Sequence, residues 1–301
     1  MKGFYPEGYG QTADGAKRKK YTMEELKDAM IRGDVLEAVA YMCDSDHNLL
    51  VDLGCIRGVI PRVEGALGIA EGTTRDIAII SRVGKSVCFT VEEISAGYAL
   101  LSRRRAQQLC KEQFLNGLKC GDVIKGKVTH METFGAFLDI GCGNVALLPI
   151  DAISVSRISH PADRFRTGDD LRVIIKNVDS AGRITLSHKE LLGSWEENAT
   201  NFSQGETVSG IVRSIETYGI FIELAPNLAG LAEPKEGVRV GQRASVYIKS
   251  VIPEKMKVKL IIIDSFETDT LIPFHYYFEG EHIDKFTYSP PSCEKNIETV
   301  F

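Results

Sequence analysis

The chain has 301 residues, of which 44% are hydrophobic and 26% are charged, and these proportions are typical of globular proteins. A formal net charge of −5 excludes a uniformly cationic nucleic-acid-binding body. The seven cysteines include no C-x-x-C pair, which argues against a disulfide framework or a structural zinc site and favours a reducing compartment.

The N-terminal region, residues 1–32, is expected to hold a disordered stretch and a short helix. Residues 1–20 lack a hydrophobic period, and the basic run Lys17–Lys20 is typical of a solvated tail. Thr22 and Glu25 match the capping-box pattern, which predicts a helix that ends near Gly33.

An internal repeat organises residues 33–264. GDVIKGKVTHMETFGAFLDIG (121–141) aligns with GETVSGIVRSIETYGIFIELA (205–225), so that Gly121 falls on Gly205 and Gly135 on Gly219. A fainter copy lies upstream, where LLVDLGCIRGVIP (49–61) resembles FLDIGCGNVALLP (137–149). The pattern predicts three units, at 33–103, 120–190 and 204–264.

Each unit shows short alternating strands separated by turn residues. In the second unit we place strands near 123–133, 135–140, 144–148, 171–178 and 183–187. Gly126 and Gly210 lie inside strands, where a barrel bend requires a residue without a side chain. The predicted fold class is therefore all-β, with three tandem five-stranded OB-fold barrels joined by short helices.

The connecting segments are predicted to be helical. One helix covers 104–119, and a second covers 191–203, where Ser194 and Glu197 repeat the capping-box pattern. The tail, 265–301, is acidic but rich in aromatic residues. FHYYF (274–278) and HIDKFTY (282–288) predict a hairpin that packs on the third barrel.

Strand parity predicts the direction of the repeated aromatic side chains. Phe137 shares a strand face with Asp139, and Phe221 shares one with Glu223. The opposite faces form continuous aliphatic rows, namely Ala136, Leu138 and Ile140, and Ile220, Ile222 and Leu224. Because a face that carries a carboxylate should be hydrated, we expect both phenylalanine rings on the outside of their barrels.

Cationic residues alternate with inward aliphatic positions on neighbouring strands, and we expect their side chains to face outward: Lys125, Lys127, Arg183, Lys257 and Lys259. Exposed rings with nearby cations suit single-stranded nucleic acid, because bases stack on rings and cations hold phosphates. The alternatives are core rings and simply solvated lysines. Parity does not place Phe134 and Tyr218, which precede a glycine bend.

Two further groups have open roles. Asp179 precedes Gly182 and is typical of a turn-forming residue. The long 150–170 loop either reaches RNA or is an ordinary surface loop, and its candidate residues are Arg157, His160, Arg164 and Arg166.

The stretch 121–141, followed by VDSAGRITLS (178–187), closely resembles the S-1 RNA-binding domain, the OB-fold module repeated in bacterial ribosomal protein S-1. The resemblance extends over the full length of the second unit, is shorter internally in the third and is degenerate in the first. It implies an RNA platform formed by two aromatic residues around the glycine, a histidine, an aspartate and an arginine. The matching positions are Phe134, Phe137, Asp179 and Arg183 in the second unit, and Tyr218, Phe221 and Lys257 in the third.

The chain departs from that pattern at several positions. The family histidine is replaced by Pro149 in the second unit and by Glu233 in the third, where Pro253 also replaces the aspartate. In the first unit the aromatic positions hold His47 and Leu50, and Tyr98 stands where the arginine is expected. The first site therefore lacks the elements of the platform.

The resemblance implies an RNA-binding protein of translation. It would hold single-stranded mRNA on the second and third barrels and dock to the 30S ribosomal subunit through the first. The alternative is a protein-interaction scaffold, or an RNA-decay or regulatory adaptor that is not stably bound to ribosomes. The expected RNA-binding residues are Phe134, Phe137, Lys125, Lys127, Asp179, Arg183, Tyr218, Phe221, Lys257 and Lys259.

The sequence also indicates several absences. It contains no Walker motif, H-E-x-x-H motif, nucleophile elbow or acidic metal cluster, so we expect no enzymatic activity, small-molecule substrate, cofactor or metal. It has neither an apolar signal region nor an apolar run of membrane-spanning length, which predicts a cytoplasmic protein without a membrane partner.

Overall fold

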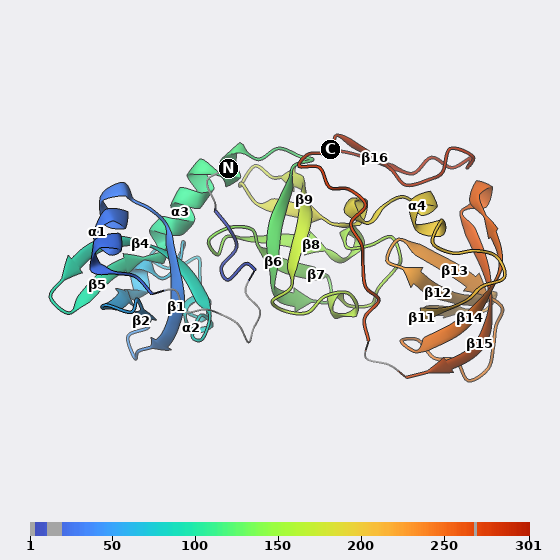
Figure 1. Ribbon diagram of the computed structural model, residues 1–301, viewed down its shortest axis with the longest axis horizontal. Coiled ribbons are helices and arrows are strands. Elements are labelled where there is room, and N and C mark those ends of the chain that lie inside the picture. Colours follow the sequence, from blue (N-terminus) through green and yellow to red (C-terminus); the bar gives the residue numbers. More distant parts are fainter. Residues whose placement is uncertain (1–3, 11–19, 268–269) are drawn as a thin grey trace.

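Three closed five-stranded barrels follow one another along the long axis of the molecule (Figure 1). They are seen in a computed structural model that describes residues 4–10, 20–267 and 270–301. Lys17–Lys19 of the basic run lie outside the described residues. The prediction of three tandem OB-type barrels is confirmed.

The first barrel follows helix α1 (Met23–Arg32). The predicted capping box of Thr22 and Glu25 is present, and the helix ends at Gly33 with a left-handed φ of 66°. The strand order is β1-β2-β3-β5-β4, and a short helix α2 (Ile77–Ile80) lies between β3 and β4. The strands are β1 (Leu36–Cys43), β2 (Leu49–Asp52), β3 (Arg57–Ile60), β4 (Ser86–Ser95) and β5 (Tyr98–Ser102).

The second barrel follows helix α3 (Arg103–Gln113), which ends earlier than the predicted 104–119 helix and continues as a 3-10 turn at Leu115–Gly117. The barrel closes where β10 pairs in parallel with β8, and its strand order is β10-β8-β7-β6-β9. The strands are β6 (Val123–Glu132), β7 (Gly135–Asp139), β8 (Val145–Pro149), β9 (Asp170–Val178) and β10 (Ile184–Ser187).

The third barrel follows helix α4 (Trp195–Ala199), whose capping box of Ser194 and Glu197 is present. Its strand order is β11-β12-β13-β15-β14, with the same parallel closure between β13 and β15. The strands are β11 (Thr207–Glu216), β12 (Gly219–Ala225), β13 (Leu228–Ala232), β14 (Arg243–Ile252) and β15 (Lys257–Phe266).

The glycines of the repeated phrase are required by close backbone approach. A Cβ atom at Gly135 would lie 2.5 Å from the carbonyl oxygen of Leu148, and one at Gly219 would lie 2.6 Å from that of Ala232. Non-bonded carbon and oxygen atoms do not lie this close together, so a side chain at either position would force the backbone to shift. The glycine therefore lets each aromatic strand turn tightly against its neighbour.

The N-terminal segment, defined as residues 4–10, is not disordered as expected but packs between the first and second barrels (Figure 1). Glu7 is buried within it and contacts both barrels. Tyr5 accepts a hydrogen bond through its carbonyl oxygen from the N–H of Cys142 at 2.9 Å. The segment thus joins two domains that the sequence pattern treats separately.

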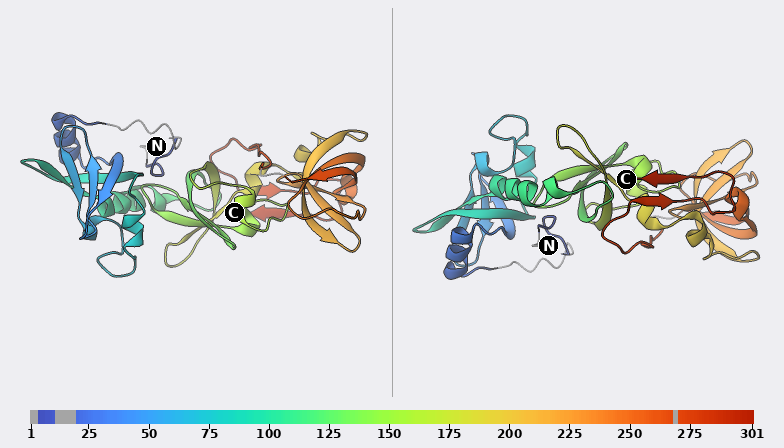
Figure 2. Two further views of the ribbon diagram at one scale, coloured as in Figure 1. Left: turned by 90° about the horizontal axis from the view of Figure 1, so that it is seen from below. Right: turned by 90° about the horizontal axis from the view of Figure 1, so that it is seen from above.

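The predicted C-terminal hairpin is wrong in its pairing. Residues 274–278 form no strand, and β16 (Lys285–Thr287) pairs instead with β17 (Glu298–Val300). Figure 2 shows this pair between the second and third barrels. The tail contacts both barrels, because Ile283 donates its N–H to the Gly121 carbonyl and the Tyr288 hydroxyl donates to that of Asn227. Among the described residues, none of the helices has the length and apolar character needed to cross a membrane.

Candidate nucleic-acid interface

The second barrel presents two aromatic rings on its outer surface. Phe134 is 55% exposed and Phe137 is half-buried, and neither ring belongs to the barrel core. The rings meet edge to face, with centroids 5.9 Å apart and planes at 88°. Phe137 therefore lies on the outside as parity predicts, and the structure adds the position of Phe134, which parity did not determine.

The third barrel repeats this arrangement. Tyr218 is 66% exposed and Phe221 is half-buried, with centroids 6.1 Å apart and planes at 88°. The two pairs thus have the same geometry on equivalent strands of separate barrels. Open aromatic faces of this kind can stack nucleobases.

Phe137 and Phe221 each belong to a row of paired residues that crosses four strands of their barrel. In the second barrel Phe137 pairs with His130 on β6 and with Leu147 on β8, and Leu147 pairs with Thr185 on β10. The His130 ring stacks on Phe137 with a centroid distance of 6.2 Å and an interplanar angle of 20°. His130 thus extends the aromatic surface.

Sequence reasoning missed His130. A bulge shifts the β6–β7 register between Val128 and His130, so simple alternation along β6 fails there. The signal that could have found it is cross-strand pairing with Phe137, which becomes readable only once the register is known.

The equivalent row of the third barrel ends on a cation. Phe221 pairs with Leu231, and Leu231 pairs with Lys259. Lys259 and Lys257 are both exposed, as expected. Lys259 therefore places a positive charge on the strand row that holds Phe221.

In the first barrel the corresponding row is aliphatic, with Met42, Leu50, Val59 and Leu100 at paired positions. Leu50 is buried, whereas Met42 is exposed. His47 has a left-handed φ of 63° and faces Asp76 at 3.4 Å. This barrel keeps the fold without the rings.

Asp179 and Arg183 form a tight turn before β10. Asp179 accepts the backbone N–H groups of Ala181 and Arg183 at 2.9 Å each, and the Arg183 Nε at 2.6 Å. Hydrogen bonds from the backbone and side chain of Arg183 lower the pKa of Asp179. Asp179 is thus a turn former, and the Arg183 side chain remains 83% exposed.

Lys125 and Lys127 do not join the aromatic pair. Lys127 forms an ion pair with Asp170 at 2.7 Å, and Lys125 lies over the rings of Tyr5 and Tyr9. Both lysines lie beside the N-terminal segment, on the part of β6 before the bulge. The structure therefore separates them from Phe134 and Phe137.

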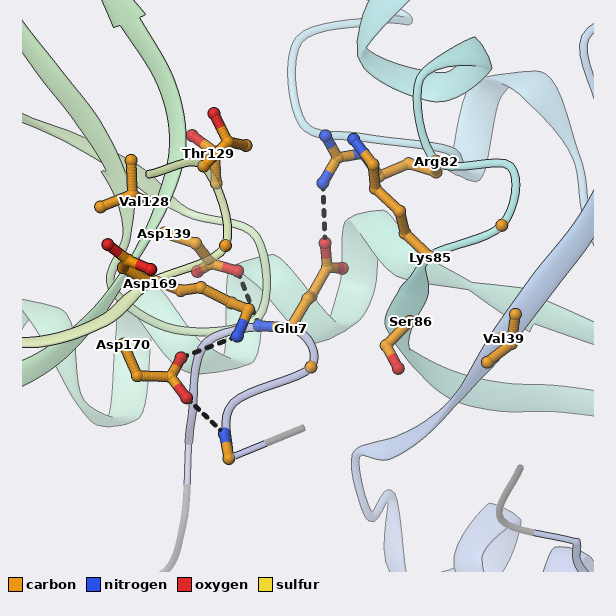
Figure 3. A pocket seen from close by; sticks show the side chains of 16 residues that line it. Glu7, Val39, Arg82, Lys85, Ser86, Val128, Thr129, Asp139, Asp169 and Asp170 are labelled. Atoms are coloured by element: carbon orange, nitrogen blue, oxygen red, sulfur yellow. Dashed lines mark hydrogen bonds and ion pairs between the residues drawn. The ribbon is translucent and has the colours of Figure 1, made fainter. Parts of the chain in front are cut away.

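The expectation of hydrated carboxylates is wrong for Asp139. Its side chain is 2% exposed, although it shares the outer face of β7 with Phe137. It accepts N–H groups from Glu7 at 2.7 Å, Gly141 at 2.8 Å and Gly143 at 3.0 Å. Burial and the nearby Glu7 charge raise the pKa of Asp139 to about 7. Figure 3 shows the hydrogen bond between the Glu7 backbone N–H and the Asp139 carboxylate.

Glu223 is also buried, for a different reason. It is fully enclosed and forms ion pairs with Arg213 and with Arg164, the latter at 2.5 Å. Arg164 comes from the 150–170 loop and is itself 2% exposed. That loop therefore uses Arg164 to hold the second barrel against the third, while Arg157 and Arg166 remain on the surface.

Within residues 4–10, 20–267 and 270–301, no three His, Cys, Asp or Glu side chains are grouped so as to hold a metal ion. The arrangement of the second and third barrels offers exposed rings, cations and backbone-supported turns. Such a surface can bind a flexible chain with aromatic and anionic groups.

Sequence comparison relates this chain to proteins with RNA-binding domains. Residues 118–189 match the family described as S1 RNA binding domain. Small ribosomal subunit protein bS1 of Staphylococcus aureus (strain COL) is 31% identical over 266 residues, covering 82% of this chain and 64% of that protein. The bS1 protein of Staphylococcus haemolyticus is 30% identical with the same coverage. The chain thus spans less than two thirds of the length of these relatives.

Among solved structures, a multidomain protein with nucleic acid binding domains from Streptococcus pneumoniae covers 78% of this chain and 75% of its own. Its sequence identity is 16% and its TM-score is 0.26.

Proposed function

Because this chain belongs to the S-1 family, we propose that it binds single-stranded RNA on the outer aromatic surfaces of its second and third barrels. The observation that carries the proposal is the duplicated edge-to-face pair, Phe134 with Phe137 and Tyr218 with Phe221. Stacking on such rings contributes about 1–3 kcal/mol per base and is largely independent of base identity.

The charge distribution supports modest, salt-sensitive binding. Arg183, Lys257 and Lys259 are exposed near the aromatic rows, but the whole chain carries a net charge of −5. Each phosphate that a cation neutralises contributes a slope of about −0.7 to the dependence of log affinity on log salt. A small number of contacts therefore yields a shallow salt dependence.

The first barrel has a different proposed role, as the docking site for the 30S ribosomal subunit. Its row at the platform position is aliphatic, and Met42, Tyr41 and Tyr98 are exposed around it. An apolar surface of this kind suits a protein partner better than a phosphate backbone. In this assignment the second and third barrels hold mRNA near the site of translation.

Oligonucleotide binding tests the RNA assignment. The double variant Phe137→Ala with Phe221→Ala should bind a fluorescent oligouridylate about tenfold or more weakly, because two stacking surfaces are lost. Tyr98→Ala removes an exposed ring from the first barrel and serves as the matched control. Unchanged affinity of the double variant would rule out the platform.

Gradient sedimentation tests the docking assignment and its competitor, an adaptor that is not stably bound to ribosomes. Met42→Glu places a charge in the exposed apolar row of the first barrel. It should reduce co-sedimentation with 30S subunits while leaving oligouridylate affinity unchanged. If wild-type protein never co-sediments with 30S subunits, the adaptor alternative is favoured.

A further inference from the structure

A second aromatic pair, with one exposed and one half-buried ring, lies on the N-terminal segment, apart from the Phe134–Phe137 pair. The rings of Tyr5 and Tyr9 stack with centroids 5.9 Å apart and planes at 23°. Tyr5 is 47% exposed. The sequence pattern indicated nothing here, because both residues fall in a region expected to be disordered.

Lys125 joins these rings from β6. Its Nζ atom lies 4.9 Å from the Tyr5 ring centroid and 5.0 Å from that of Tyr9. Among the described residues, none of the carboxylates lies within ion-pair distance of Lys125. A π face attracts the ammonium group without neutralising its charge, so Lys125 can still donate hydrogen bonds to an anion.

A second cation lies beside Lys125. Arg172 occupies the paired position on β9, and its guanidinium group donates to the carbonyl oxygens of Phe278 at 2.5 Å and Gly280 at 2.8 Å. It also lies 5.6 Å from the Tyr276 ring centroid. These partners are uncharged. Asp170, two residues before Arg172 on β9, is paired with Lys127.

The N-terminal segment is held rigidly enough to present its rings. Besides the Tyr5 carbonyl bond to Cys142, Gly10 donates its N–H to Asp170 at 2.7 Å, and Glu7 is anchored between the two barrels. Binding to a preformed surface avoids the entropy cost of ordering it.

We propose that Tyr5, Tyr9, Lys125 and Arg172 form a second contact site for single-stranded RNA on the second barrel. A base contacts the exposed part of the Tyr5 ring, and a phosphate binds at Lys125 and Arg172. Lys125 and His130 are five residues apart along β6, or roughly 16 Å at about 3.3 Å per residue. One RNA strand can therefore reach both sites. This inference rests on the proposed function.

The test compares oligouridylates of about 6 and about 18 nucleotides, lengths near and above the footprint of one OB barrel. Tyr5→Leu keeps an apolar side chain but removes the ring. It should weaken binding of the longer RNA about five- to tenfold and that of the shorter RNA much less. Tyr41→Leu, an exposed tyrosine of the first barrel, is the matched control and should change neither.

Lys125→Gln provides an independent measurement on β6. It should lower the salt slope for the longer RNA by about 0.7, the value expected for one lost phosphate contact. Lys125→Arg keeps the cation and should retain the slope. Hydrogen exchange at the Cys142 N–H reports whether the segment is still docked in each variant.

The outcomes separate the two proposals. If the Phe137/Phe221 variant loses affinity while docked Tyr5→Leu and Lys125→Gln proteins bind like the wild type, the second site is refuted and the platform stands. If wild-type protein binds neither RNA, both proposals fail. A 4-thiouridine crosslink to Tyr5 or Tyr9, together with the length-dependent loss, would support the second site.

Discussion

Glu7 and Arg103 form a buried bidentate ion pair, in which Arg103 Nε and Nη2 donate to the Glu7 carboxylate at 2.7 and 2.9 Å. The Glu7 backbone N–H donates in turn to Asp139 on the second barrel, and the Cys88 N–H of the first barrel donates to the Glu7 side chain. One residue of the N-terminal segment therefore links both barrels and the helix between them. Figure 3 shows Glu7 between Asp139 of the second barrel and Arg82 of the first.

Glu7→Gln should loosen this junction, because it leaves the Arg103 charge buried without its partner. Breaking such a pair costs about 3–5 kcal/mol. Hydrogen exchange at the Cys88 N–H should accelerate, since that group donates to Glu7. Glu24→Gln, an exposed glutamate on α1, should have no effect. Unchanged exchange in Glu7→Gln would show that the ion pair does not hold the barrels together.

Acid should loosen the same junction. Burial alone would raise the pKa of Glu7, but the charges of Arg103 and Arg82 and hydrogen bonds lower it overall. A carboxylate with a lowered folded-state pKa stabilises the fold above its unfolded pKa, and this stability is lost as pH falls through the folded value. In the wild type, protection of the Cys88 N–H against hydrogen exchange should therefore decline in acid. Glu7→Gln lacks the titrating carboxyl group, so the part of the decline that Glu7 causes should be absent.

Substitutions at the second-to-third barrel junction should be asymmetric. Glu223→Gln removes the ion-pair partner of the buried Arg164 and leaves Arg213 with Asp163 alone at 3.7 Å, whereas Arg164→Met leaves Glu223 paired with Arg213. We expect the larger loss of stability for Glu223→Gln. Hydrogen exchange at the Ser156 N–H, which donates to the Pro226 carbonyl across the junction, measures it. Equal effects of both variants would contradict this account.

His188 should make the docking of the C-terminal tail sensitive to pH. Burial, together with the nearby Arg164 charge, lowers the pKa of His188 to about 4 although its hydrogen bond to the Ile153 carbonyl opposes the shift. The unfolded chain then binds more protons between about pH 4 and 6.5, so stability falls as pH is lowered through that window. A shift from 6.5 to about 4 corresponds to roughly 3 kcal/mol.

Exchange at the Tyr277 N–H, which donates to the Leu191 carbonyl, follows this docking. Protection should decrease between pH 6.5 and 4 in the wild type. The decrease should become smaller in His188→Gln and stay unchanged in His275→Gln, an exposed tail histidine. Equal pH dependence in all three proteins would exclude His188 as the cause.

Gly135→Ala should disrupt the aromatic pair through the backbone. The added Cβ atom would lie 2.5 Å from the Leu148 carbonyl oxygen, which forces β7 away from β8. Overpacking of this kind costs about 1–3 kcal/mol. We expect a lower melting temperature for the second barrel and weaker oligouridylate binding. Gly117→Ala, where a Cβ atom meets open space, is the control. A variant as stable as the wild type would contradict the steric argument.

The sequence by itself determined the three barrels, the inward aliphatic rows and the outward direction of Phe137 and Phe221. These features depend on the alternation of polar and apolar residues and on turn residues within short stretches of sequence. The same pattern also occurs in more than one repeat unit. The capping boxes of α1 and α4 are equally local and were predicted at the correct residues.

Only the tertiary structure decided which outward positions are covered. Asp139 is buried by Glu7, 132 residues away in the chain, and Glu223 by Arg164 of another barrel. The tail pairs with itself in a register that its local pattern did not indicate. Strand periodicity specifies which face of the strand a side chain occupies. Whether that face is buried depends on which distant segment packs against it. Contacts between distant segments produce no periodic pattern in the local sequence, so the sequence alone does not predict them.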